Sequence, residues 1–180
     1  GWEARSELGY RTEDILRYTV AAPAFAPDDP DGPRLRAELG SLRAAMGQDG
    51  LSGYDRALAA LPDDPATLRG RAVARLRAGD PHGARADAAR ATKVAPDAPE
   101  GWALLGELEG RLGDAAAAER AFARALELAP DRAGGWQARA TTRDQRGDHA
   151  AAAEDYARAV ELDPTLALCW ERLVVTRQAV

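Results

Sequence analysis

The side chains that carry most acid–base and nucleophilic chemistry are scarce in this sequence. Two histidines, His82 and His149, and one cysteine, Cys169, are spread over 180 residues. Each histidine falls near the start of a predicted helix, where we expect a solvated side chain. No histidine lies near Cys169, which favours a buried structural thiol over a nucleophile. Phosphate-binding glycine loops, zincin motifs and nucleophile elbows are absent. We therefore expect a chain that is not an enzyme and has no catalytic, cofactor-binding or metal-binding residues.

Arginine is the residue whose pattern points to recognition chemistry. Four arginines of one predicted helix lie close together: Arg69, Arg71, Arg75 and Arg77. Residues 65–98 carry seven basic and three acidic residues, whereas the whole chain has a net charge of −5. A guanidinium binds a carboxylate through two parallel hydrogen bonds, so the cluster suits an acidic peptide. A structural alternative is equally open, because Arg75, Glu109 and Arg143 share one 34-residue column and could form a ladder of ion pairs.

Net charge and hydropathy exclude other classes of partner. A net charge of −5 argues against nucleic acid, because phosphate binding needs a basic surface. No apolar run is long enough to span a bilayer, and the first residues lack the pattern of a signal peptide. We expect no membrane partner and a cytoplasmic location. Lys93 is the single lysine among 24 basic residues, which together with the many alanines indicates a GC-rich bacterial genome.

Several residue types recur every 34 residues, and this period predicts the fold. The tryptophans are Trp102, Trp136 and Trp170, and the prolines are Pro62, Pro96, Pro130 and Pro164. The glycine–aspartate pairs are Gly79-Asp80, Gly113-Asp114 and Gly147-Asp148. A fixed period of this length is typical of a helical repeat array.

The recurring residues have plain roles in pairs of amphipathic helices. We expect each glycine to end a first helix in the left-handed conformation, and each aspartate to cap the second helix. One face of such a second helix is formed by Ala118, Phe122, Ala125 and Leu126, at positions i, i+4, i+7 and i+8. Each proline is expected to end the second helix.

Residues 99–132 resemble the tetratricopeptide repeat closely, through Trp102, Leu105, Gly106, Gly113, Ala118, Phe122, Ala125 and Pro130. Residues 133–166 also match, residues 65–98 match more weakly, and residues 31–64 form a degenerate repeat. The resemblance implies an all-α fold, an α-solenoid of antiparallel helix pairs that winds into a right-handed superhelix.

The two ends of the sequence depart from the repeat. Residues 1–30 are expected to form an N-terminal helical segment, with a helix from about Thr12 to Ala22 that resembles a decayed half-repeat. Residues 167–180 are expected to form a C-terminal capping helix, because arrays need a terminal helix to cover the last unit. This cap is unusually apolar, with Trp170, Leu173 and Val174 among its residues.

The resemblance implies a concave groove lined by the first helices, in which a partner peptide or helix binds. The matching positions are Arg69, Val73, Arg77, Glu107, Arg111, Gln137, Thr141, Asp144 and Gln145. Some family members clamp the acidic tail of a chaperone, but Val73 stands where that clamp has asparagine, so we do not predict chaperone-tail binding.

Three functions remain open from the sequence. The leading hypothesis is a non-catalytic protein–protein interaction scaffold that binds a partner, with an acidic segment as the suggested ligand. One alternative is the regulatory or targeting segment of a larger multidomain enzyme, which rests on analogy alone. The other is a self-associating structural protein that forms a homodimer through residues 167–180.

Overall fold

The computed structural model describes residues 51–178, which form two compact units divided after Pro62. The predicted N-terminal helical segment, 1–30, and most of the degenerate repeat, 31–64, lie outside the described residues. The described part of the first unit is helix α3 (Leu51–Ala60), whose buried face carries Gly53, Tyr54, Ala57 and Leu58.

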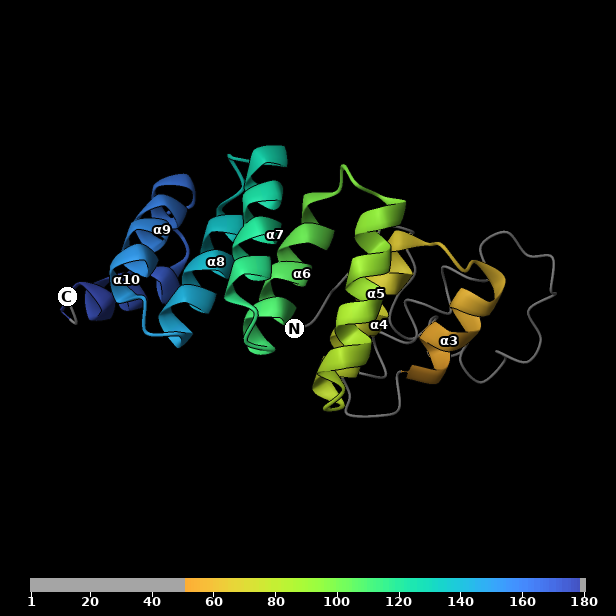
Figure 1. Cartoon of the computed structure of the whole chain (residues 1–180). Coiled ribbons are helices and arrows are strands. Elements are labelled where there is room, and N and C mark those ends of the chain that lie inside the picture. The colour runs from red at the N-terminus through yellow and green to blue at the C-terminus, as the bar shows by residue number, and fades with distance from the viewer. Residues whose placement is uncertain (1–50, 179–180) are drawn as a thin grey trace, which may run out of the picture. The chain divides into compact units, whose positions relative to one another are not determined.

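The second unit consists of seven helices within residues 63–178. They are α4 (Pro65–Arg77), α5 (Pro81–Val94), α6 (Pro99–Arg111), α7 (Ala115–Leu128), α8 (Ala133–Gln145), α9 (His149–Leu162) and α10 (Ala167–Gln178). Each first helix packs along its own second helix, in the pairs α4–α5, α6–α7 and α8–α9, and α10 packs on α9. The first helices α6 and α8 also contact each other, so successive pairs stack (Figure 1). This is the all-α repeat solenoid that the sequence predicts.

The turn inside each pair is built as the glycine–aspartate columns predict. Gly79, Gly113 and Gly147 have φ angles of 82°, 88° and 84°, in the left-handed region that side chains with a Cβ avoid. The aspartate that follows accepts a hydrogen bond from a backbone N–H in the next turn, as Asp80 does from Gly83 at 2.8 Å. These caps fix where each second helix begins.

The tryptophan and proline columns are joined by a hydrogen bond that spacing alone did not reveal. The indole N–H of Trp102 donates to the carbonyl of Pro96 at 2.9 Å, and Trp136 donates to Pro130 at the same distance. Trp170 donates to Pro164 at 3.1 Å. Each tryptophan therefore ties the start of a first helix to the turn before it.

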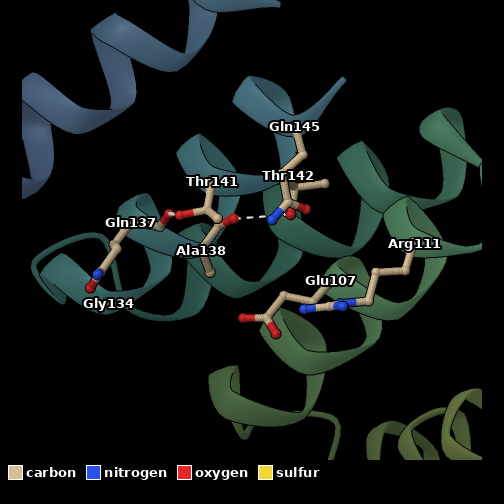
Figure 2. Close-up of a pocket in the computed structure, with 8 residues that line it drawn as sticks. All are labelled: Glu107, Arg111, Gly134, Gln137, Ala138, Thr141, Thr142 and Gln145. Atoms are coloured by element: carbon tan, nitrogen blue, oxygen red, sulfur yellow. Dashed lines mark hydrogen bonds between the residues drawn. The ribbon is translucent and has the colours of Figure 1, made fainter. Parts of the chain in front are cut away.

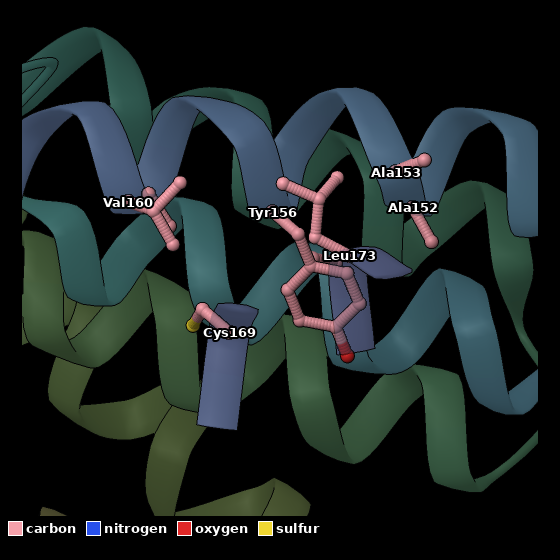
Figure 3. Packing of buried hydrophobic residues seen from close by; sticks show 8 residues of the cluster. Ala152, Ala153, Tyr156, Val160, Cys169 and Leu173 are labelled. Atoms are coloured by element: carbon pink, nitrogen blue, oxygen red, sulfur yellow. The ribbon is translucent and has the colours of Figure 1, made fainter. Parts of the chain in front are cut away.

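Small residues let the paired helices approach closely, and aromatic residues fill the remaining space. An added Cβ on Gly106 would lie 2.9 Å from ring carbons of Phe122, which is 1% exposed. In the last pair, Tyr156, Val160 and the α10 residues Cys169 and Leu173 form a continuous buried cluster (Figure 3). The buried Cys169 agrees with the structural thiol that the sequence predicts, and burial raises the pKa of its thiol.

Charged residues also hold the helix pairs together, in a pattern that corrects the predicted ladder. Arg75, Glu109 and Arg143 do not pair with one another among the described residues; each pairs with a second helix. Arg85 of α5 binds Glu109 at 2.7 Å, and Arg143 binds Glu119 of α7 at 2.6 Å. Residues of one 34-residue column lie in different helix pairs. A second helix lies between two such pairs, and its charged side chains therefore form the ion pairs.

Candidate binding groove

The candidate groove lies on the face that the first helices α4, α6 and α8 present. Of the nine predicted groove residues, Arg77, Arg111 and Gln145 are exposed and all others except Asp144 are partly buried. Ala72 and Ala140 lie on another face of these helices and are buried, in clusters with Ala88 of α5 and Tyr156 of α9. The helix period thus separates a packing face from a candidate binding face on each first helix.

A pocket of about 210 Å³ opens between α6 and α8 on this face. Five predicted groove residues line it: Glu107, Arg111, Gln137, Thr141 and Gln145. Figure 2 shows Glu107 and Arg111 on α6 and the other lining residues on α8, with the Arg111 side chain extending toward Glu107. The lining also includes Gly134, Ala138 and Thr142, which the sequence analysis missed. Ala138 and Thr142 each follow a predicted residue by one position, so a wider face of the same helix would have found them.

The α8 side of the pocket is held rigidly by hydrogen bonds. The Thr141 hydroxyl donates to the carbonyl of Gln137 at 2.9 Å, and the Tyr156 hydroxyl of α9 reaches Thr141 at 3.3 Å. Thr142 donates to the carbonyl of Ala138 at 3.0 Å. The threonine hydroxyls are therefore occupied, which leaves the amides of Gln137 and Gln145 as the adaptable groups of this wall.

Glu107 is the acidic residue of the pocket. Its side chain is largely enclosed, and this desolvation raises the pKa of the carboxyl, while the nearby Arg111 charge acts in the opposite direction. The two residues are one helical turn apart, but no ion pair within 4.0 Å joins them. A bound hydrogen-bond donor would relieve the desolvated carboxylate.

The arginines of the first helices divide into two groups by their partners. Arg71 and Arg75 both bind the buried Asp87, at 2.6 and 2.9 Å, and Arg139 and Arg143 bind the buried Asp155 in the same way, at 2.7 and 2.9 Å. In contrast, the groove arginines Arg69, Arg77 and Arg111 have no ion pair with a carboxylate within residues 51–178. The first group is structural, and the second group is available for a ligand.

Asp144 differs from the other predicted groove residues. It is 6% exposed, and its carboxylate binds Arg172 of α10 and His149 of α9, the latter at 2.9 Å. It joins three helices and has little surface left for a ligand. The sequence predicted a solvated side chain for both histidines. His82 is exposed, as predicted, whereas His149 is partly buried and binds Asp144.

Residues 51–178 hold neither a candidate metal site nor a candidate membrane span. No group of three or more His, Cys, Asp and Glu side chains there could hold a metal ion. None of the helices described has both the length and the apolar character needed to cross a bilayer.

Solved structures of repeat proteins resemble this chain in fold. A tetratricopeptide repeat protein from Parabacteroides merdae has a TM-score of 0.76 and 20% identity, over 93% of this chain and 67% of that chain. The MamA protein has a TM-score of 0.66 and 18% identity, over 84% of each chain. The first such domain of Spaghetti (RPAP3), bound to the HSP90 peptide SRMEEVD, has a TM-score of 0.58 and 21% identity, over 64% of this chain and 91% of that chain.

Sequence comparison gives the family directly. A search of curated protein sequences found no match. The sequence profile of the tetratricopeptide repeat matches residues 69–133 and 104–167, which together span more than half of the 180 residues. The 34-residue period, the helix pairs and this match agree, and the chain belongs to the tetratricopeptide repeat family.

Proposed function

We propose that the chain is a protein-interaction scaffold that binds an extended acidic segment of another protein in the groove of α4, α6 and α8. The tetratricopeptide fold is that of an interaction scaffold, and one structural neighbour was solved with a peptide that contains adjacent glutamates. Repeat proteins of this kind hold peptides through a few anchors on a rigid surface.

The observation that carries the proposal is the division of the first-helix arginines. Folding alone explains Arg71, Arg75, Arg139 and Arg143, because each offsets the charge of a buried aspartate. Folding does not explain Arg77 and Arg111, which are exposed on the groove one repeat apart. Two such guanidinium groups suit two carboxylates of one extended segment.

The pocket beside Arg111 limits which segments fit. The desolvated Glu107 repels a carboxylate and favours a hydrogen-bond donor. The amides of Gln137 and Gln145 accept either type of group. A segment with acidic residues separated by a neutral donor side chain therefore fits better than an unbroken acidic run.

A titration of the chain with labelled peptides tests the proposal. The probe is a fluorescein-labelled peptide of alternating glutamate and glutamine, and its control replaces glutamate by lysine. The double variant Arg77→Glu with Arg111→Glu should bind the acidic probe up to about thirtyfold more weakly, since the two reversed pairs cost up to about 1 kcal/mol each. The difference should shrink as salt is added.

A matched control separates local from global charge effects. Arg124→Glu with Arg158→Glu makes the same change in net charge on the exposed second helices α7 and α9. This variant should bind the acidic probe like the wild type. Equal losses in both double variants, or no loss in either, would refute the groove as the binding surface.

A further inference from the structure

The terminal helix α10 has one packed face and one open apolar face. Cys169, Leu173 and Thr176 are at most 4% exposed, because they pack on α9. A second face carries Trp170 and Val174, which are 47% and 54% exposed. Large apolar residues gathered on one exposed face mark an interaction surface. This face lies outside the groove proposed above, so the inference is independent of that function.

The other first helices show what covers this face. In steps of 34 residues, Val174 follows Ala72, Gly106 and Ala140. Ala72 and Ala140 are 0% exposed, and Gly106 is buried, each in a first helix that packs along its own second helix. The open face of α10 therefore continues an interface that residues 63–178 already form three times, with an α-helix as the occupant each time.

The charge on this face indicates what the covering helix carries. Arg177 occupies the column of Arg75 and Arg143. Both of those arginines bind an aspartate of the covering helix at 2.9 Å, Asp87 and Asp155 respectively. Arg177 is exposed and has no carboxylate partner within residues 51–178. A covering helix with an acidic residue at the same place would complete the pair.

The size of Val174 limits the size of the residue that follows the acidic residue on the covering helix. In α5 the aspartate is followed by Ala88, and in α9 it is followed by Tyr156. The close approach of Gly106 to the Phe122 ring leaves no room for even one added carbon. Because Val174 is larger than the glycine and alanines in its column, a small residue must face it, as Ala88 faces α4.

We propose that the open face of α10 docks an amphipathic α-helix that presents an acidic residue to Arg177 and an adjacent alanine to Val174. The α10 helix of a second copy suits the face poorly. Its single acidic residue, Glu171, is followed by Arg172, so it offers no acidic–small pair. The occupant is thus a helix with the pattern of α5.

The chain itself supplies a probe for this surface. A fluorescein-labelled peptide of residues 79–95, cross-linked on its exposed side to hold it helical, contains the Asp87–Ala88 pair. It should bind the full chain saturably, and Val174→Glu should abolish binding. Val174 is 54% exposed, so this variant should keep the helical content and melting temperature of the wild type.

Two complementary changes test the chemistry of the contact. Arg177→Asp should weaken binding of the probe up to about fivefold, and a probe with Asp87→Arg should recover that loss on the Arg177→Asp chain. A probe with Ala88→Tyr should bind the wild type weakly and should bind Val174→Ala more tightly.

Four outcomes would overturn the proposal. They are no saturable binding of the helical probe, binding that Val174→Glu leaves intact, charge reversals that do not compensate, and a tyrosine probe that gains nothing from Val174→Ala. Sedimentation of the chain alone adds a separate check. A dimer that Val174→Glu dissociates would assign the face to a second copy instead.

Discussion

Replacing Asp155 by alanine should destabilise the last helix pair severely. The Asp155 side chain is 4% exposed and accepts hydrogen bonds from Arg139 at 2.7 and 2.8 Å and from Arg143 at 2.9 Å. The two guanidinium groups are themselves only 16% and 17% exposed. Alanine would leave one buried cation without its counterion and the other with Glu119 alone.

The magnitude follows from the burial of these charges. Removing one member of a buried ion pair costs about 3–5 kcal/mol, mainly because the remaining charge is desolvated without compensation. In the repeat of residues 99–132 the same two columns hold uncharged residues. Leu105 stands in place of Arg139, and Ala121 stands in place of Asp155. The double variant Arg139→Leu with Asp155→Ala should therefore lose about 2 kcal/mol or less, because it removes the stranded cation.

Urea unfolding followed by circular dichroism measures both variants against the wild type. Glu127→Ala is a suitable control, because its pair with Arg124 at 3.1 Å is exposed, and its loss should cost less than about 1 kcal/mol. If Asp155→Ala costs no more than this control, or if the double variant is as unstable as the single one, the structural role assigned to these arginines is wrong.

Three further predictions concern packing, pH and thiol reactivity. Gly106→Ala should lower the melting temperature and cost about 1–3 kcal/mol, because the added carbon meets the Phe122 ring at 2.9 Å; an unchanged melting temperature would contradict the close packing. The hydrogen bond from Arg143 lowers the pKa of Glu119, so this pair stabilises the fold above the usual carboxyl pKa and is lost as pH falls through the lowered value. Glu119→Gln should thus be less stable than the wild type in urea at neutral pH, with a gap that closes in acid; a constant gap would exclude the ion pair as its cause. The buried Cys169 should react with a thiol reagent only at the rate of local or global unfolding, and rapid labelling under native conditions would show that α10 does not cover it.

The sequence predicted the features that a 34-residue step repeats. Gly113 and Asp114 act within one turn of their own position, so local backbone rules suffice to assign them. The buried face of α7 with Phe122 follows from helical period alone. These residues define the helix pairs and therefore most of the fold.

The partners of the charged residues were not predictable in the same way. Arg71 meets Asp87 sixteen residues on, and Arg85 meets Glu109 twenty-four residues on. Such contacts depend on how helices lie against each other, which a column of equivalent positions does not contain. The sequence did contain a signal of these ion pairs, because Glu119 and Arg143 repeat the 24-residue spacing of Arg85 and Glu109 with the charges reversed. Arg71 and Arg77 look alike in sequence. In the structure Arg71 binds Asp87, whereas Arg77 has no carboxylate partner among the described residues.

The most direct test of the account is site-specific photo-crosslinking in a lysate of the source organism. A photoreactive phenylalanine analogue is placed at Gln137, in the groove, or at Arg120, on the exposed side of α7. We expect a covalent adduct with the same protein in repeated experiments from Gln137, none from Arg120, and loss of that adduct when Arg77→Glu and Arg111→Glu are added. An adduct from Arg120 alone, or one from Gln137 that survives both charge reversals, would contradict the assignment of the first-helix groove as an acidic-peptide site.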